Sequence, residues 1–143
     1  MLYLDKLFII LMKKLLYAAM LLLGVGIMAV SCKKDNSDNY ENAILGEWAV
    51  VKVETYENGK LTETFTPTDK QKMSIIFNKN GKITTMEYYN GETDSYTDDY
   101  SISGKMLTVD GDSMEIKKLT KTELVLYLVD GNDELRYYFK RVK

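Results

Sequence analysis

The sequence predicts an all-β domain in which an antiparallel meander of about eight to nine strands closes into a barrel. From Ile44 onward, short runs rich in β-branched and aromatic residues recur at intervals of roughly ten residues, which is typical of barrels and sandwiches. Turn sequences such as Asn58-Gly59 separate these runs, and no helical periodicity of useful length interrupts them. The predicted barrel domain therefore covers residues 44–143.

The candidate strands are joined by short connections, so each strand is expected to pair with its neighbour in the sequence. Asn58-Gly59 supplies the positive φ angles of a tight hairpin turn, and Pro67 ends the second strand because it lacks a backbone donor. Closing the sheet removes the two exposed edges of an open meander. The predicted strands cover residues 47–57, 60–65, 72–77, 82–89, 95–102, 105–109, 113–119, 123–129 and 134–142.

Alternation along the strands predicts which side chains point into the barrel, because neighbouring residues of a strand face opposite sides of the sheet. The strand at 123–129 is apolar on both faces, which predicts a central position or a covered outer face. The predicted inward pairs are Ile75 and Phe77, Tyr100 and Ile102, Leu107 and Val109, Met114 and Ile116, and Tyr137 and Phe139.

Residues 1–31 are predicted to be a cleaved signal peptide. Lys13 and Lys14 precede an uncharged apolar run at 15–30, and small residues follow, which is the arrangement of a secretory signal. The run is shorter than the ~20 residues that span a bilayer comfortably, and a retained transmembrane helix is the alternative. Residues 1–11 precede the natural start at Met12 and are interpreted as an over-extended start.

Cys32, the single cysteine of the chain, ends the sequence "AVSC", which resembles the lipobox of bacterial lipoproteins. The resemblance implies diacylation of the Cys32 sulfur, by palmitate or a similar chain, and cleavage before this residue. Two or more acyl chains anchor a protein stably where one does not. The alternative is an incidental or buried cysteine. Residues 32–43 are then a lipidated N-terminus and polar linker, and the predicted location is the outer membrane, on its periplasmic or cell-surface face.

The composition argues against several classes of function. The chain has no histidine, so it lacks the usual general base and the commonest metal ligand. Its net charge of −2 provides no electrostatic footprint for nucleic acid. No carboxylate pair is singled out for glycosidase chemistry. We therefore predict no enzyme, no cofactor and no metal site, because EF-hand spacing is absent from the acidic pairs Asp98 and Asp99, Asp110 and Asp112, and Asp130 and Asp133.

The opening strand "ILGEWAVV" resembles the Gly-x-Trp strand of lipocalins, and with "IIFNKNGKI", "DYSISGKMLTV" and the terminal "YYFKR" the order resembles small bacterial lipocalin-like domains carried on lipoproteins. The resemblance implies that Trp48 closes one end of the barrel under the guanidinium of Arg141. Such a pair gains roughly 0.5 to 2 kcal/mol as it loses water. An ordinary buried tryptophan with Arg141 in solvent is the alternative.

The lipocalin resemblance also implies a cup for a small apolar or amphipathic ligand. Aromatic and methionine side chains offer flat or adaptable apolar surface for such a ligand, although both are also ordinary strand and core residues. The alternative is a filled, ligand-free barrel that binds a protein or a glycan on its outer face. The candidate ligand-binding residues are Met86, Tyr88, Tyr96, Tyr100, Tyr127 and Tyr137.

Overall fold

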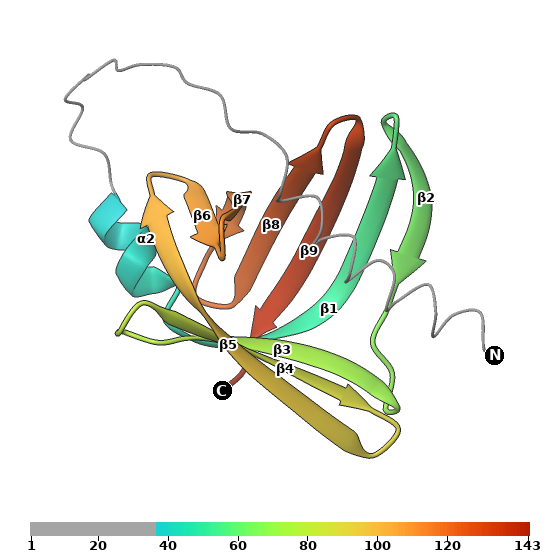
Figure 1. Ribbon diagram of the computed structural model, residues 1–143, viewed down its shortest axis with the longest axis horizontal. Coiled ribbons are helices and arrows are strands. Elements are labelled where there is room, and N and C mark those ends of the chain that lie inside the picture. Colours follow the sequence, from blue (N-terminus) through green and yellow to red (C-terminus); the bar gives the residue numbers. More distant parts are fainter. Residues whose placement is uncertain (1–36) are drawn as a thin grey trace. The chain divides into compact units, whose positions relative to one another are not determined.

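The computed structural model describes residues 37–143 (Figure 1). The predicted signal peptide and the lipidation site at Cys32 lie outside the described residues, so both stay predictions. Within residues 37–143, no helix is long and apolar enough to cross a membrane. The described part contains one helix, α2 (Ser37–Ala43), and nine strands: β1 (Gly46–Glu57), β2 (Lys60–Phe65), β3 (Gln71–Phe77), β4 (Lys82–Tyr89), β5 (Glu92–Ser103), β6 (Met106–Val109), β7 (Asp112–Leu119), β8 (Glu123–Asp130) and β9 (Asp133–Arg141).

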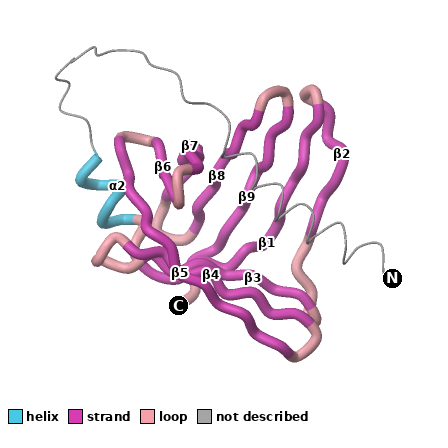
Figure 2. Tube along the Cα trace, in the orientation of Figure 1, coloured by secondary structure: helices cyan, strands magenta, loops and turns pink. Residues whose placement is uncertain are grey.

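The predicted all-β barrel is confirmed. Strands β1, β3, β4, β5, β6, β7, β8 and β9 pair in this order, always antiparallel, and β9 pairs back with β1 to close the barrel. Short turns join the strands, as Figure 2 shows. The first turn is typical: Asn58 and Gly59 have φ angles of 51° and 78°, as a tight hairpin between twisted strands requires.

Strand β1 departs from simple pairing between sequence neighbours. The edge of β1 that does not pair with β9 forms hydrogen bonds with two different strands. Gly46–Ala49 pairs with β3, whereas Val53–Glu57 pairs with β2. Strands β2 and β3 do not pair with each other in the described chain. Pro67 lies directly after β2, which it helps to end because it lacks a backbone donor. Thr68 and Gln71 then exchange backbone hydrogen bonds in the turn that leads into β3. The barrel is therefore split on this side, and β2 is a ninth strand outside the closed ring (Figure 1).

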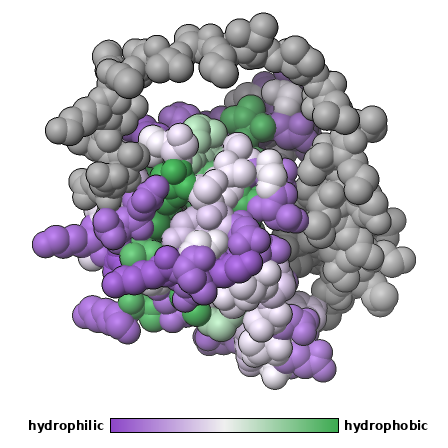
Figure 3. All heavy atoms as spheres, turned by 60° about the vertical axis from the view of Figure 1, so that its left-hand side comes forward, coloured by the Kyte–Doolittle hydropathy of each residue, from purple (hydrophilic) through white to green (hydrophobic). Residues whose placement is uncertain are grey.

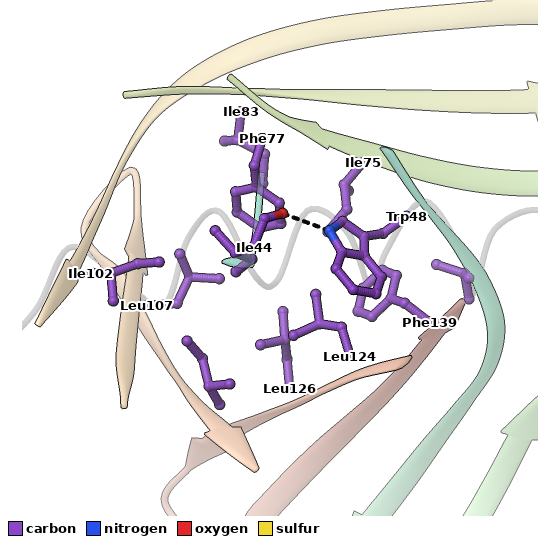
Figure 4. Packing of buried hydrophobic residues seen from close by; sticks show 12 residues of the cluster. Ile44, Trp48, Ile75, Phe77, Ile83, Ile102, Leu107, Leu124, Leu126 and Phe139 are labelled. Carbon is purple, nitrogen blue, oxygen red and sulfur yellow. Dashed lines mark hydrogen bonds between the residues drawn. The ribbon is translucent and has the colours of Figure 1, made fainter. Parts of the chain in front are cut away.

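The core fills the end of the barrel where β1 begins and β9 ends. Figure 4 shows side chains from β1, β3, β5, β6, β8 and β9 that meet around Trp48. The inward pairs predicted from alternation all belong to this cluster, either buried or packed against it. We call this end the closed end. Its buried residues are Ile44, Trp48, Val50, Ile75, Phe77, Ile83, Ile102, Leu107, Ile116, Leu124, Leu126 and Phe139.

Helix α2 occupies part of the segment that we expected to be a linker. The helix begins at Ser37 and ends at Ala43. The Ile44 amide donates to the Tyr40 carbonyl at 2.9 Å and continues the helical turn into the core. Ile44 is fully buried and Tyr40 packs against the core cluster. Burial of these two apolar side chains explains why a polar segment is ordered here.

Candidate binding site at the open end of the barrel

The closed end is held by contacts between its aromatic and cationic residues. The Trp48 indole is fully buried, and its Nε1 donates to the Ile44 carbonyl at 2.7 Å (Figure 4). The Arg141 guanidinium carbon lies 4.1 Å from the centre of the Trp48 ring. Arg141 also donates to the carbonyls of Ala43 and Leu45, both at 2.6 Å, and to that of Lys121 at 2.8 Å. One side chain thus joins β9 to the end of α2, to the start of β1 and to the turn before β8.

Gly46 completes this arrangement and was not among the site residues predicted from the sequence. Its φ angle of 109° is one that other residues rarely adopt. A Cβ atom at this position would lie 3.0 Å from Nη1 of Arg141. The glycine of the "GEW" sequence is therefore needed both for its backbone conformation and for the approach of the guanidinium.

The opposite end, where β1 meets β2 and β8 meets β9, is open. Here the side chains that face the lumen are only partly buried; they include Val53 of β1, Met73 of β3 and Tyr137 of β9. Tyr96 of β5, on the same face, is 43% exposed. Apolar and aromatic side chains of the inner face therefore stay partly exposed above the filled closed end. We call this region the open end.

Two tyrosines of the lumen face, Tyr96 of β5 and Tyr137 of β9, have raised pKa values. Burial, then the nearby Tyr96 and Asp112, raises the pKa of Tyr137 to about 12. Burial and the Glu87 carboxylate raise the pKa of Tyr96 to about 12, and the Tyr96 hydroxyl donates to Glu87 at 3.2 Å. Both phenols therefore remain neutral at physiological pH.

A groove of about 510 Å³ lies at the split in the barrel, where β1 leaves β3. Val50 and Met73, which belong to the lumen-facing sets of their strands, contribute apolar surface to it. Residues of the turn before β3 contribute the polar part. The sequence did not predict this groove, because the lack of pairing between β2 and β3 creates it. The full lining is Ala49, Val50, Pro67, Thr68, Asp69, Lys72 and Met73.

The six candidate ligand-binding residues fall into two groups of three. Tyr96, Tyr100 and Tyr137 alternate in phase with buried residues of β5 and β9 and face the lumen. Tyr100 lies lower, with its ring edge against Phe77 and its hydroxyl donating to the Asn78 carbonyl at 3.0 Å. The other three alternate in the opposite phase and lie on the outer face; they are Met86, Tyr88 and Tyr127.

The outer tyrosines are covered by cations from neighbouring strands. Arg136 lies 3.9 Å from the Tyr56 ring centre and 4.8 Å from that of Tyr127, and Lys52 lies 4.1 Å from that of Tyr138. A ring face covered by a cation does not offer itself for stacking with a sugar. On the face that Figure 3 shows, hydrophobic residues appear only as separate spots among hydrophilic ones.

The acidic residues form no metal site in the described chain. No group of three or more potential ligands among residues 37–143 is arranged to hold a metal ion. Asp99 pairs with Lys82 at 2.6 Å, whereas Asp98 lies on the other face of β5. Burial, then the charges of Asp110 and Asp130, raises the pKa of Asp112.

Comparisons with known proteins identify the type of domain. A family model described as a lipocalin-like domain matches residues 44–126, which is more than half of the chain. Among solved structures, the chain is similar to a deswapped triple mutant of bovine odorant-binding protein, with a TM-score of 0.42 and 18% sequence identity, covering 70% of this chain and 74% of that chain. No curated protein matches the chain.

Proposed function

Because the chain belongs to the family of lipocalin-like domains, we propose that it is a binding or carrier protein, and not an enzyme, for a small apolar or amphipathic ligand held at the open end. One observation carries the proposal: the closed end is filled by side chains, whereas lumen-facing Val53, Met73 and Tyr137 at the open end are only partly buried. Small-molecule sites are usually lined by mostly apolar side chains with a few polar groups, and the lumen-facing side chains of the open end are of these kinds.

The groove at the split in the barrel supports the same function. Val50 and Met73 contribute apolar surface to its lining, and both residues belong to the lumen-facing sets of β1 and β3. A ligand seated at the open end can therefore extend toward this groove. The groove volume of about 510 Å³ lies within the usual range of small-molecule sites, roughly 300–1,000 Å³.

Fluorescence titration with a neutral apolar dye such as N-phenylnaphthylamine tests the proposal. We expect saturable binding that weakens about tenfold in Tyr137→Ala, because the variant removes a lumen-facing aromatic surface. Tyr127→Ala is the matched control, since Tyr127 lies on the outer face of the adjacent strand, and it should bind the dye as the wild type does. Absence of saturable binding to the wild type would contradict the proposal and favour a filled barrel that binds partners on its outer face.

We also propose that Cys32 anchors the protein to the outer membrane through acyl chains. The support is the sequence "AVSC" and the apolar run before it. Metabolic labelling with a palmitate analogue, followed by membrane fractionation, tests this. The label should be incorporated by the wild type and lost in Cys32→Ala, and protease treatment of intact cells should then distinguish the cell-surface face from the periplasmic face. Equal labelling of the two proteins would contradict the proposal.

A further inference from the structure

Four exposed lysines gather at the closed end of the barrel, on β7, in the β7–β8 turn and around the end of β9. Contacts of Arg141 hold these segments together, because its amide donates to the Thr122 carbonyl at 3.0 Å and its Nε donates to the Lys121 carbonyl at 2.8 Å. We call the four lysines the basic patch. Its members are Lys118, Lys121, Lys140 and Lys143.

A single carboxylate lies among the lysines of the basic patch within the described strands. Glu123 is directly opposite Lys140 in the register of β8 and β9, and its carboxylate lies 2.5 Å from Nζ of Lys118. The other three lysines form no ion pair within residues 37–143. Two further acids of the closed end, Asp38 and Glu41, belong to α2, the helix that contacts β5. The basic patch therefore exposes net positive charge to the solvent.

The opposite end of β8 and β9 carries charge of the other sign. Glu57, Asp130 and Asp133 lie at the hairpin turns of the open end, and all three are exposed. None of them forms an ion pair in the described part of the chain. Lys60 is the cation of these turns. Charge thus changes sign along the barrel, from acidic at the open end to basic at the closed end.

The chain enters the domain at the basic end. Helix α2 begins at Ser37, and its last residue, Ala43, accepts a hydrogen bond from Arg141 at 2.6 Å. Ser37 is the fifth residue after Cys32 in the sequence. Five residues span at most about 18 Å even when fully extended. An acylated Cys32 would therefore hold the closed end, and not the open end, close to the membrane surface.

We propose that the basic patch docks on the anionic head groups of phospholipids, so that the closed end faces the membrane and the open end faces away from it. This inference rests on the proposed acylation of Cys32 and goes beyond it, because it names the surface of the domain that meets the membrane and the lipid chemistry that this surface recognises.

The physical reason is charge complementarity at short range. A lysine near an anionic lipid surface is attracted to it over a Debye length, about 10 Å at 0.1 M salt. The short chain between Cys32 and Ser37 raises the effective concentration of the basic patch at that surface. The exposed acids of the open end are repelled by the same surface. Attraction at one end and repulsion at the other favour a single orientation of the barrel.

Energy transfer from a fluorophore on the protein to rhodamine-labelled lipid tests the inference. The acylated protein, produced from the full chain, is reconstituted in vesicles of phosphatidylcholine alone or mixed with phosphatidylglycerol. A fluorophore is attached to Thr122→Cys, at the closed end, or to Asn132→Cys, at the open end, and acylation blocks Cys32, the only native cysteine. Phosphatidylglycerol should increase transfer from position 122 and decrease transfer from position 132. High salt should reverse both changes.

Paired lysine variants assign the effect to the basic patch. Lys121→Gln/Lys140→Gln should reduce the ratio of docked to undocked protein about tenfold in vesicles that contain phosphatidylglycerol. The matched control is Lys60→Gln/Lys70→Gln, which also removes two exposed lysines without an ion pair in the described chain and should leave the ratio unchanged. Circular dichroism and thermal melts verify that each variant is folded.

The outcomes separate docking of the basic patch from the anchor. Transfer that does not respond to phosphatidylglycerol or to salt, or equal effects of the two double variants, would overturn the docking and leave the anchor intact. Increased transfer from position 132 would overturn it by showing that the open end faces the membrane. Failure of the protein to float with neutral vesicles would overturn the anchor, on which the inference rests.

Discussion

The two ends of the barrel are formed by the same strands but are built differently. At the closed end, fully buried side chains surround Trp48, and Arg141 satisfies three backbone carbonyls. At the open end, lumen-facing side chains stay partly exposed, and carboxylates on the same faces lack ion-pair partners in the described chain. The comparison shows how one strand such as β1 has fully buried side chains at one end and partly exposed ones at the other.

The largest loss of stability is expected from a substitution at the centre of the closed end. Trp48→Ala should reduce the free energy of unfolding by about 3–5 kcal/mol, because it leaves a cavity and removes the surface under Arg141. Tyr96→Ala, an aromatic deletion at the open end, should cost less than about 1 kcal/mol, since Tyr96 is 43% exposed. Urea unfolding of both variants measures the difference. Equal losses would mean that the two ends do not differ in their contribution to stability.

Removal of the guanidinium should have the next largest effect. Arg141→Met keeps much of the apolar stem but leaves the carbonyls of Ala43 and Leu45 without their donor. We expect a loss of about 2–3 kcal/mol, measured by the same unfolding experiment. Arg141→Lys should recover only part of it, because an ammonium group cannot reproduce a planar fork of donors. Full recovery by lysine would show that charge alone is sufficient.

A smaller loss of stability is expected when Gly46→Ala adds a methyl group beside Arg141. Gly46→Ala places a Cβ atom 3.0 Å from the guanidinium at a φ angle of 109°. The strained backbone should cost about 1–3 kcal/mol, visible as a lower melting temperature. Gly91→Ala is the control: its φ angle is 100°, but a Cβ atom there meets nothing within 4 Å. If both variants melt alike, backbone strain accounts for the whole effect.

Near neutral pH, the smallest change in the free energy of unfolding is expected for Tyr137→Phe. The pKa of Tyr137 is raised from its ordinary value of 10.0 to about 12, so the folded state holds the phenol proton more tightly than the unfolded state does. Stability should therefore be unaffected below about pH 10 and fall between about pH 10 and about pH 12. Tyr137→Phe should reduce this alkaline loss. Tyrosinate absorbance during titration provides the measurement, and a phenol that ionises at its ordinary pH would contradict the assignment.

Much of the strand pattern could be predicted from the sequence, because turn residues and alternation are local signals. Asn58-Gly59 indicated its hairpin, and the shared parity of Tyr137 and Phe139 indicated their common face. The split between β2 and β3 could not be predicted, since it depends on which of two strands occupies the far edge of β1. The helix at Ser37–Ala43 was missed because Ile44, which orders it, follows a polar segment.

Prediction of the candidate site was less complete, for the same physical reason. Alternation indicated an inward face for Tyr137, but the strand at 123–129 is apolar on both faces, so Tyr127 could be assigned to the outer face only when β8 and β9 were placed in register. That Asp98 and Asp112 form no ion pair within residues 37–143 is a property of the assembled barrel and has no local signal. Gly46 could have been noticed in "GEW", but only the position of Arg141 explains why a side chain is excluded there.

The contact between Ala43 and Arg141 determines how the domain can be attached to a surface. Helix α2 and the end of β9 lie together at the closed end, whereas the hairpin turns at Asn58-Gly59 and Gly131-Asn132 lie at the open end. A covalent handle at Ser37 or at Lys143 therefore holds the domain by its closed end. Sensor chips and affinity resins prepared through either position would leave the open end facing the solution.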